Sequence, residues 1–170
     1  MGMSAAKLQV AGIEPESIVD GPGIRFAVFV QGCPHKCPGC HNPGTHPFQG
    51  GSAMDIEEVF AQFRRNPLLK GITLSGGEPF CQAGPLAELA RLVHSACKDV
   101  VVYTGYTYEE LAASEDPAVQ SLLSETDLLI DGPFIEEQKD LDLLFRGSEN
   151  QRLIDMKRTR ARGQVVLWEQ

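Results

Sequence analysis

The sequence predicts an α/β fold, built as a partial, open (β/α) barrel of about five to six parallel strands. Short valine-rich apolar runs alternate with segments of helical periodicity, which is typical of a parallel sheet. Each strand and its helix take roughly 25–30 residues, whereas a closed eight-unit barrel needs about 200–250 residues. The chain has 170 residues, so the barrel stays open.

Length and composition are those of an ordinary globular chain. We expect a single domain over residues 1–170, with a short basic tail from about residue 157. Hydrophobic residues make up 42% of the chain, yet no apolar run is long enough to span a membrane. The net charge of −8 argues against nucleic acid as a partner. Residues 1–11 do not resemble a signal peptide, so we expect a cytoplasmic protein with reduced thiols.

The strands are predicted from short runs of β-branched and aromatic residues. A leading strand is expected at 8–13, and the clearest strand at 25–31, just before Gly32. Further strands of the same kind are expected at 71–75, 100–103, 127–131 and, near the C-terminus, 164–168.

The helices are predicted from apolar residues that recur three and four positions apart. One helix is expected from Ser52 to Asn66, because Pro67 ends it, and a second from about Pro85 to Ala96. Thr107 and Glu110 have the spacing of a capping box, which begins a short helix, and another helical piece follows at 118–123.

Four unusual segments each follow a strand directly. They are the cysteine-containing loop after Gly32, Gly76-Gly77-Glu78-Pro79, Thr104-Gly105-Tyr106 and Gly132-Pro133-Phe134. Because the carboxyl ends of parallel strands meet at one edge of a sheet, we expect these segments to converge there. Active sites of parallel α/β folds lie at that edge.

The loop carries Cys33, Cys37 and Cys40 with the spacing C-x3-C-x2-C. Three thiolates in eight residues can bind an iron–sulfur cluster or zinc. A four-iron cluster held by three cysteines leaves one iron open to a small-molecule ligand, which suits catalysis. A zinc site would take His41 or His35 as its fourth ligand, although zinc pairs are usually separated by a longer loop.

Glycine pairs occur in many turns, so Gly76-Gly77-Glu78 gains its meaning from its position after a strand. Two glycines let the backbone approach a ligand closely. The carboxylate of Glu78 can bind an ammonium group or brace the loop.

The other cysteines and histidines carry less information. Cys97 lies on an apolar helical face and is expected to be a buried thiol, and Cys81 is also expected to be structural. We assign no role to His46 or His94.

The cysteine spacing together with Gly76-Gly77-Glu78-Pro79 resembles the radical S-adenosylmethionine enzymes. The lead-in 20–25 (DGPGIR) and Cys40-His41-Asn42 resemble the branch that activates glycyl-radical enzymes. Later segments are similar to the activators of anaerobic ribonucleoside-triphosphate reductase, namely 103–106 (YTGY), 131–134 (DGPF) and 146–152 (RGSENQR). The resemblance covers about residues 15–155.

The resemblance implies a ligand set. Cys33, Cys37 and Cys40 would hold a [4Fe-4S] cluster whose open iron binds S-adenosylmethionine. The cofactor would also lie against two groups of residues. They are Gly39, Cys40 and His41 in the loop, and Gly76, Gly77, Glu78, Thr104 and Asp131 at the ends of the later strands.

The resemblance also implies a reaction and partners. One electron from an external reductant such as flavodoxin would cleave the cofactor to a 5′-deoxyadenosyl radical. That radical would take a hydrogen atom from a glycine of the reductase large subunit. Because the cofactors carry this chemistry, we expect no catalytic acid or base among the side chains.

Several alternatives remain open on the sequence. The chain can instead activate another glycyl-radical enzyme such as pyruvate formate-lyase, act on a small molecule, or be a non-catalytic zinc-stabilised binding module. Arg146 and Arg152 either hold the partner or brace the fold with Glu149. The basic residues 157–162 are either a solvated tail or a docking patch for an acidic protein.

Overall fold

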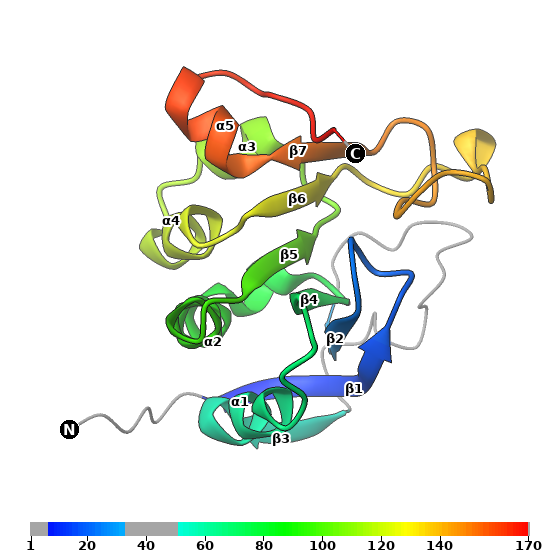
Figure 1. The fold of residues 1–170 in the computed structure, drawn as a ribbon. Coiled ribbons are helices and arrows are strands. Elements are labelled where there is room, and N and C mark those ends of the chain that lie inside the picture. The colour runs from blue at the N-terminus through cyan, green and yellow to red at the C-terminus, as the bar shows by residue number, and fades with distance from the viewer. Residues whose placement is uncertain (1–6, 33–50, 170) are drawn as a thin grey trace.

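The computed structural model describes residues 7–32 and 51–169, which form a seven-stranded sheet in the order β3-β1-β2-β4-β5-β6-β7 (Figure 1). The strands are β1 (Lys7–Ser17), β2 (Arg25–Val30), β3 (Ser52–Asp55), β4 (Gly71–Gly76), β5 (Asp99–Tyr103), β6 (Leu128–Asp131) and β7 (Arg152–Asp155). The α-helices are α1 (Ile56–Arg64), α2 (Ala83–Ser95), α3 (Tyr108–Ala112), α4 (Pro117–Ser124) and α5 (Met156–Arg162). Two short 3-10 helices, η2 (Pro79–Gln82) and η3 (Glu136–Gln138), complete the described elements.

The centre of the sheet consists of four parallel strands, β2, β4, β5 and β6. Helix α2 connects β4 to β5, and helices α3 and α4 connect β5 to β6. Such helical crossovers are what parallel neighbours require. The predicted mixture of helices and parallel strands is therefore confirmed.

The predicted number of parallel strands, five to six, is too high for the described residues. β1 runs antiparallel to β2 because only the short loop 18–24 joins them, and β3 runs antiparallel to β1. β7 runs antiparallel to β6 because segment 132–151 turns back at the same end of the sheet. Segments 18–24 and 132–151 contain no crossover α-helix, so each returns the chain antiparallel to the strand before it.

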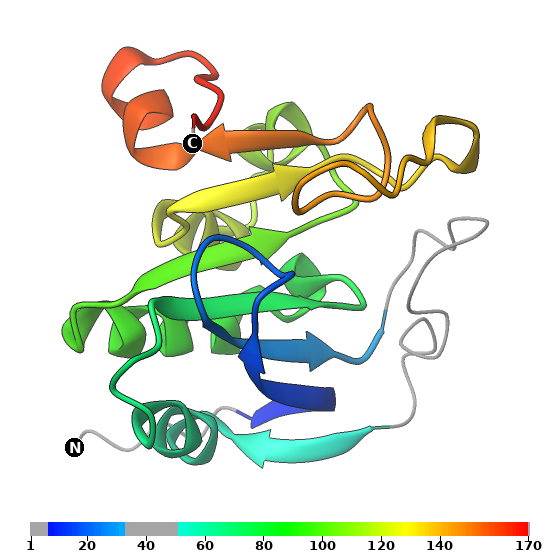
Figure 2. The same cartoon turned by 45° about the vertical axis from the view of Figure 1, so that its right-hand side comes forward.

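The two faces of the sheet are covered differently. Alternate residues of β5 belong to separate clusters, since Val100 and Val102 join the main core whereas Val101 lies in a smaller one. Helices α1, α2 and α4 supply much of the main core. Figure 2 shows the green helix α2 behind the sheet and the dark-blue loop 18–24 in front of it. The face without these helices is called the open face below.

Local signals placed some boundaries well and others badly. The capping box of Thr107 and Glu110 is confirmed at the start of α3, with Glu110 N donating to Thr107 Oγ1 at 3.2 Å. The helix predicted from Ser52 is wrong in its first turn, because residues 52–55 form β3 beside β1 and α1 begins at Ile56. Pairing with a distant strand overrode the local helical pattern there.

The C-terminal residues differ from the predicted tail. Residues 156–162 form helix α5, and Arg160 donates to the carbonyl oxygens of Leu123 and Thr126. The strand expected at 164–168 is reduced to an isolated bridge between Leu167 and Ile154. This part of the chain therefore packs along β7 rather than extending into solvent.

Cys97 was predicted to be buried, and the structure corrects this. Helix α2 ends at Ser95, and Cys97 adopts a left-handed conformation with φ of 63° that leaves its side chain exposed. Lys98 N bonds to Val93 O at 3.2 Å and closes the helix end. Cys97 thus lies just beyond the apolar face to which its spacing assigned it.

His94, to which no role was assigned, lies between two carboxylates. Its Nδ1 is 2.8 Å from Glu125 Oε1 and its Nε2 is 2.8 Å from Asp127 Oδ2. Partial burial lowers the pKa of the ring, but the hydrogen bonds and charges of Asp127 and Glu125 outweigh it, so the pKa is raised overall. The pair fastens the end of α2 to the turn before β6.

We expect His94 to make the stability of the fold depend on pH. A histidine whose pKa is raised by folding stabilises the native state below its unfolded pKa of about 6.5, and loses that contribution as pH rises through the folded pKa. The pairs are part-exposed, so the loss is up to about 1 kcal/mol. Urea denaturation at a series of pH values should show this decline above pH 6.5, and the variant His94→Gln should lack it. An equal decline in both proteins would rule out His94 as its source.

Candidate cofactor site at the carboxyl ends of the strands

The described residues contain part of the predicted site. The predicted site residues of the cysteine loop lie outside the described residues, and they are Cys33, Cys37, Gly39, Cys40 and His41. Gly76, Gly77, Glu78, Thr104 and Asp131 are described, and each lies at or just beyond the carboxyl end of β4, β5 or β6. These segments are expected to converge on one edge of the sheet, and their hydrogen bonds show how closely they lie.

The Gly76-Gly77 turn lies directly against the end of β2. Gly77 N donates to Val30 O at 2.6 Å, and Glu78 N donates to Gly32 O at 2.7 Å. Gly32 immediately precedes Cys33, so the glycine turn is fastened to the residue that leads into the cysteine loop. The glycine turn therefore lies against Gly32, the last described residue before the cysteine motif.

Both positions require glycine. Gly76 has a φ of +92°, and a Cβ there would lie 2.5 Å from Val30 N. A Cβ on Gly77 would lie 2.3 Å from the carbonyl oxygen of Gly32. A side chain at either position would push the turn away from β2.

Glu78 is completely buried and fastens the ends of β4 and β5 together. Its Oε1 accepts from Gly105 N at 2.8 Å, and its Oε2 accepts from Thr104 Oγ1 at 2.8 Å and from Phe80 N at 3.1 Å. Of the two roles considered for Glu78, bracing the turn is therefore observed. The arrangement brings Gly76, Gly77, Glu78 and Thr104 together as predicted.

Asp131 lies beside this group, but its carboxylate is engaged elsewhere. Its backbone neighbours hold the turn after β5, with Thr104 N donating to Ile130 O. The carboxylate accepts from Tyr108 N at 2.8 Å and from Arg152 Nε at 3.0 Å. Asp131 is 1% exposed, and it ties the start of β7 to the start of α3.

Arg152 braces the fold, although not through Glu149 as expected. It pairs with Asp131 and with Glu109, rather than with Glu149. The hydrogen bonds to both carboxylates raise the pKa of the guanidinium, and the same contact lowers the pKa of Glu109. Its charge is thus used inside this network.

Gln82 is a site-positioning residue that the sequence analysis missed. Its amide exchanges hydrogen bonds with the backbone of Gln9, and its Nε2 also donates to Gln31 O at 3.0 Å. Gln82 therefore holds the end of β2 one residue before Gly32. The partners lie 73 and 51 residues away in sequence, so no local pattern signalled this contact.

The 20–25 motif (DGPGIR) lies across the open face. Thr73 Oγ1 in the middle of β4 donates to Asp20 O at 2.6 Å, which holds loop 18–24 against the sheet (Figure 2). Burial and the charge of Asp20 raise the pKa of Tyr103, so its hydroxyl remains a neutral donor to Phe145 O. The motif thus covers part of the open face of the sheet.

The described residues were compared with the requirements of a metal site and of a membrane-spanning helix. In ranges 7–32 and 51–169, no three His, Cys, Asp or Glu side chains gather as a metal site. In the same ranges, no helix has the length and apolar character needed to cross a membrane. The predicted thiolate ligands belong to residues 33–40, outside those ranges.

Comparisons with known proteins give a consistent result. The family described as "4Fe-4S single cluster domain" matches residues 19–154. The "Anaerobic ribonucleoside-triphosphate reductase-activating protein" of Vibrio cholerae serotype O1 is 39% identical over 145 residues, which cover 81% of this chain and 91% of the relative. The protein of the same name from Enterobacteria phage T4 is 34% identical, covering 83% of this chain and 90% of the relative.

A solved structure also aligns in part. QueE from Escherichia coli covers 59% of this chain and 54% of its own, with a TM-score of 0.48 and 18% sequence identity.

Proposed function

The chain belongs to the family of anaerobic ribonucleoside-triphosphate reductase-activating proteins, and from this premise we propose that it installs the glycyl radical on such a reductase. It is a radical S-adenosylmethionine enzyme that uses a [4Fe-4S] cluster. The observation that carries the proposal is the match over four fifths of the chain to proteins of that name. The glycine turn fastened to Gly32, next to the cysteine motif, supports it independently.

The proposed ligands of the cluster are Cys33, Cys37 and Cys40, with Gly39 and His41 beside the cofactor. Gly76, Gly77 and Glu78 are proposed to bind the methionyl end of S-adenosylmethionine. Support comes from the position of this turn, whose glycines pack closely against the backbone of Val30 and Gly32, just before Cys33. Thr104 and Asp131 are proposed to border the cofactor from the next two strands.

When bound, the cluster and S-adenosylmethionine would supply the one-electron radical chemistry that removes a hydrogen atom from the reductase glycine. The residues of this chain bind, orient and shield. Glu78 joins the turn after β4 to the turn after β5 through hydrogen bonds to Thr104 and Gly105. Gln82 fixes the end of β2 through its hydrogen bond to Gln31 O. Such fixed positioning matters because misplacement of about 1 Å can cost 100-fold in rate.

The proposed partner is the large subunit of the reductase, and the proposed electron donor is flavodoxin or a similar one-electron reductant. A macromolecular substrate suits a sheet whose open face lacks the helices that cover the other face. A low-potential cluster also suits the reducing cytoplasm, which is the proposed compartment.

The proposed architecture is one domain over residues 1–170, a partial barrel that is open on one side. Support comes from the single sheet that all seven described strands share. Helices on one face, and loop 18–24 with segment 132–151 on the other, would then enclose the site.

The test is an anaerobic assay with the reductase and with pyruvate formate-lyase as the alternative partner. The chain is reconstituted with iron and sulfide, reduced, and given S-adenosylmethionine. We expect 5′-deoxyadenosine together with a glycyl-radical signal on the reductase, and none on a reductase whose radical glycine is replaced by alanine. A radical on pyruvate formate-lyase instead would redirect the proposal to that partner. Bound zinc without iron would contradict the enzyme proposal.

A further inference from the structure

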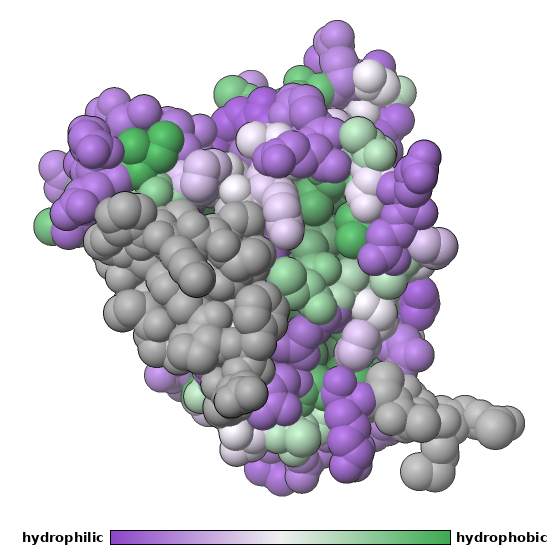
Figure 3. Space-filling view, turned by 180° about the vertical axis from the view of Figure 1, so that it is seen from behind, coloured by the Kyte–Doolittle hydropathy of each residue, from purple (hydrophilic) through white to green (hydrophobic). Residues whose placement is uncertain are grey.

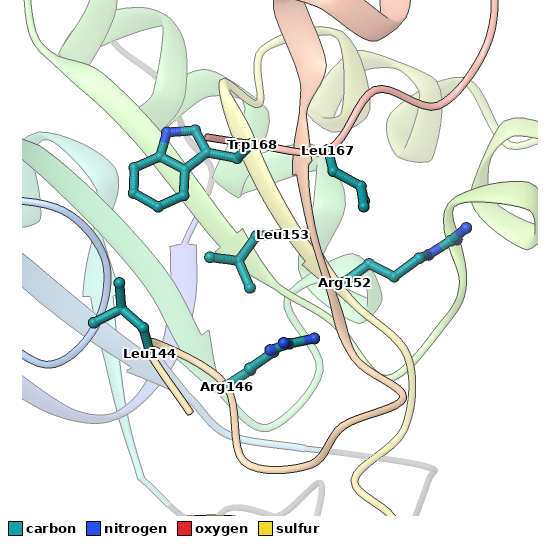
Figure 4. Close-up of a pocket in the computed structure, with 6 residues that line it drawn as sticks. All are labelled: Leu144, Arg146, Arg152, Leu153, Leu167 and Trp168. Carbon is teal, nitrogen blue, oxygen red and sulfur yellow. The ribbon is translucent and has the colours of Figure 1, made fainter. Parts of the chain in front are cut away.

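A shallow pocket of about 270 Å³ lies where segment 132–151, β7 and the C-terminal residues meet (Figure 4). Its lining combines apolar side chains with two arginines, and the residues are Leu144, Arg146, Arg152, Leu153, Leu167 and Trp168. Leu144 is 44% exposed and Leu167 is 55% exposed. Three segments of the C-terminal part of the chain therefore hold apolar side chains around an opening to solvent.

Among the described residues that line the pocket, two are arginines and none is a carboxylate. Arg152 is neutralised by Asp131 and Glu109. Arg146 donates to the carbonyl oxygens of Glu149 and Gln151, and it has no ion pair among the residues that the structure describes. Arg146 thus contributes an uncompensated positive charge beside apolar walls, which favours a carboxylate in the occupant.

The pocket adjoins the edge where the cofactor site is proposed. Arg152 is the first residue of β7, and in the antiparallel pairing of β6 with β7 it lies opposite Asp131, the last residue of β6. Segment 132–151 leaves that same end of β6 and supplies Leu144 and Arg146. In Figure 3 hydrophobic residues show among hydrophilic ones at the upper left, where this segment projects. A protein bound here would stand next to the carboxyl ends of the strands.

We propose that this pocket docks a segment of the reductase that inserts an aliphatic or aromatic side chain among Leu144, Leu167 and Trp168 and places a carboxylate on Arg146. The proposal rests on the proposed function, which requires a partner glycine to be delivered to this edge. Binding energy here is remote from the chemistry, so it acts on affinity for the partner. A second copy of this chain is the alternative occupant, which the test below distinguishes from the reductase.

The test compares charge reversal inside and outside the pocket. Arg146→Glu and Leu167→Ser change the lining, while Arg162→Glu reverses an exposed charge on α5 and serves as the matched control. Each cluster-loaded variant is titrated anaerobically with the reductase, and 5′-deoxyadenosine is measured with dithionite and without reductase. Thermal unfolding of each variant checks the fold.

We expect Arg146→Glu and Leu167→Ser each to raise the Kd for the reductase at least tenfold, with 5′-deoxyadenosine formation in its absence unchanged. Arg162→Glu should leave the Kd within threefold. Salt should weaken wild-type binding more than binding by Arg146→Glu, because screening acts on the charge pair.

Other results would overturn the docking proposal. An unchanged Kd in a folded Leu167→Ser variant would exclude this pocket as the docking site. A wild-type dimer that both lining variants abolish, with reductase binding retained, would assign the pocket to self-association. Failure of the proposed function itself looks different, since wild-type chain would then form no glycyl radical even at saturating reductase.

Discussion

Gly77→Ala should reduce 5′-deoxyadenosine formation at least 100-fold. The added Cβ would lie 2.3 Å from the carbonyl oxygen of Gly32, and the neighbouring atoms are also backbone. Backbone cannot rotate away as a long side chain can, so the turn and the end of β2 must separate. Gly32 leads into the cysteine loop, and a shift of about 1 Å in a catalytic geometry can cost 100-fold in rate. Iron content after reconstitution, S-adenosylmethionine affinity and nucleoside formation measure the effect.

Gly12→Ala is the matched control, because a Cβ on Gly12 meets nothing within 4 Å. It should retain nucleoside formation within about twofold of the parent. A Gly77→Ala protein that melts as a folded chain and keeps its activity within threefold would show that the turn does not position the cofactor. That outcome would remove Gly77 from the proposed binding residues.

Arg25→Met should destabilise the fold by about 2–3 kcal/mol, because hydrogen bonds to a charged group contribute about 1.5–3 kcal/mol and Asp99 is partly exposed to water. Arg25 is fully buried under loop 18–24. Its guanidinium donates to Thr73 Oγ1 and Ile72 O at 2.8 Å and pairs with Asp99. Loss of the guanidinium removes these hydrogen bonds from a buried position and leaves Asp99 without its pairing cation. Since small domains are stable by only about 5–15 kcal/mol, much of the stability would be lost.

Urea denaturation with an unchanged slope gives the comparison directly. Arg162→Met, which removes an exposed arginine from α5, should shift stability by less than about 0.5 kcal/mol. Arg25→Lys should remain destabilised by at least about 1 kcal/mol, because one ammonium cannot match a planar guanidinium with several donors. If Arg25→Met lost under 1 kcal/mol, the buried network would not support loop 18–24 as described.

These two predictions concern different parts of the sheet, namely its open face and the carboxyl ends of its strands. Arg25 and Thr73 lie beneath loop 18–24 and hold it against the open face. Gly77, Glu78 and Gln82 act at the carboxyl ends of the strands and hold the residues that lead into the cysteine loop. Loop stability and cofactor positioning should therefore respond to different substitutions.

The parallel core could be predicted because its signals are local. Strands β2, β4, β5 and β6 are short apolar runs bounded by glycine or by turn residues, and their predicted and observed positions agree within one or two residues. The capping box of α3 needs only two side chains three residues apart. The turns after these strands were then placed by the geometry of parallel sheets alone.

The edges of the sheet could not be predicted in the same way. Residues 52–55 form a strand only because β1 offers a free edge to them. Residues 156–162 are strongly charged, yet Asp155 caps α5 by accepting from Arg158 N, and Arg160 bonds back to the turn before β6. The cap of α5 is local, but the pairing of β3 and the contact of Arg160 with Thr126 depend on partners that are remote in sequence.

Three closely spaced cysteines, a glycine turn after a strand and the resemblance to activating enzymes can be read in the sequence, and they predict the family to which the relatives also point. The use of each polar group depends instead on the folded chain. Glu78 braces Thr104, Asp131 binds Arg152, and Gln82 holds Gln31, although 21–51 residues separate the partners. The physical reason is that motifs follow from local backbone geometry, whereas buried hydrogen-bond partners are chosen by which strands become neighbours.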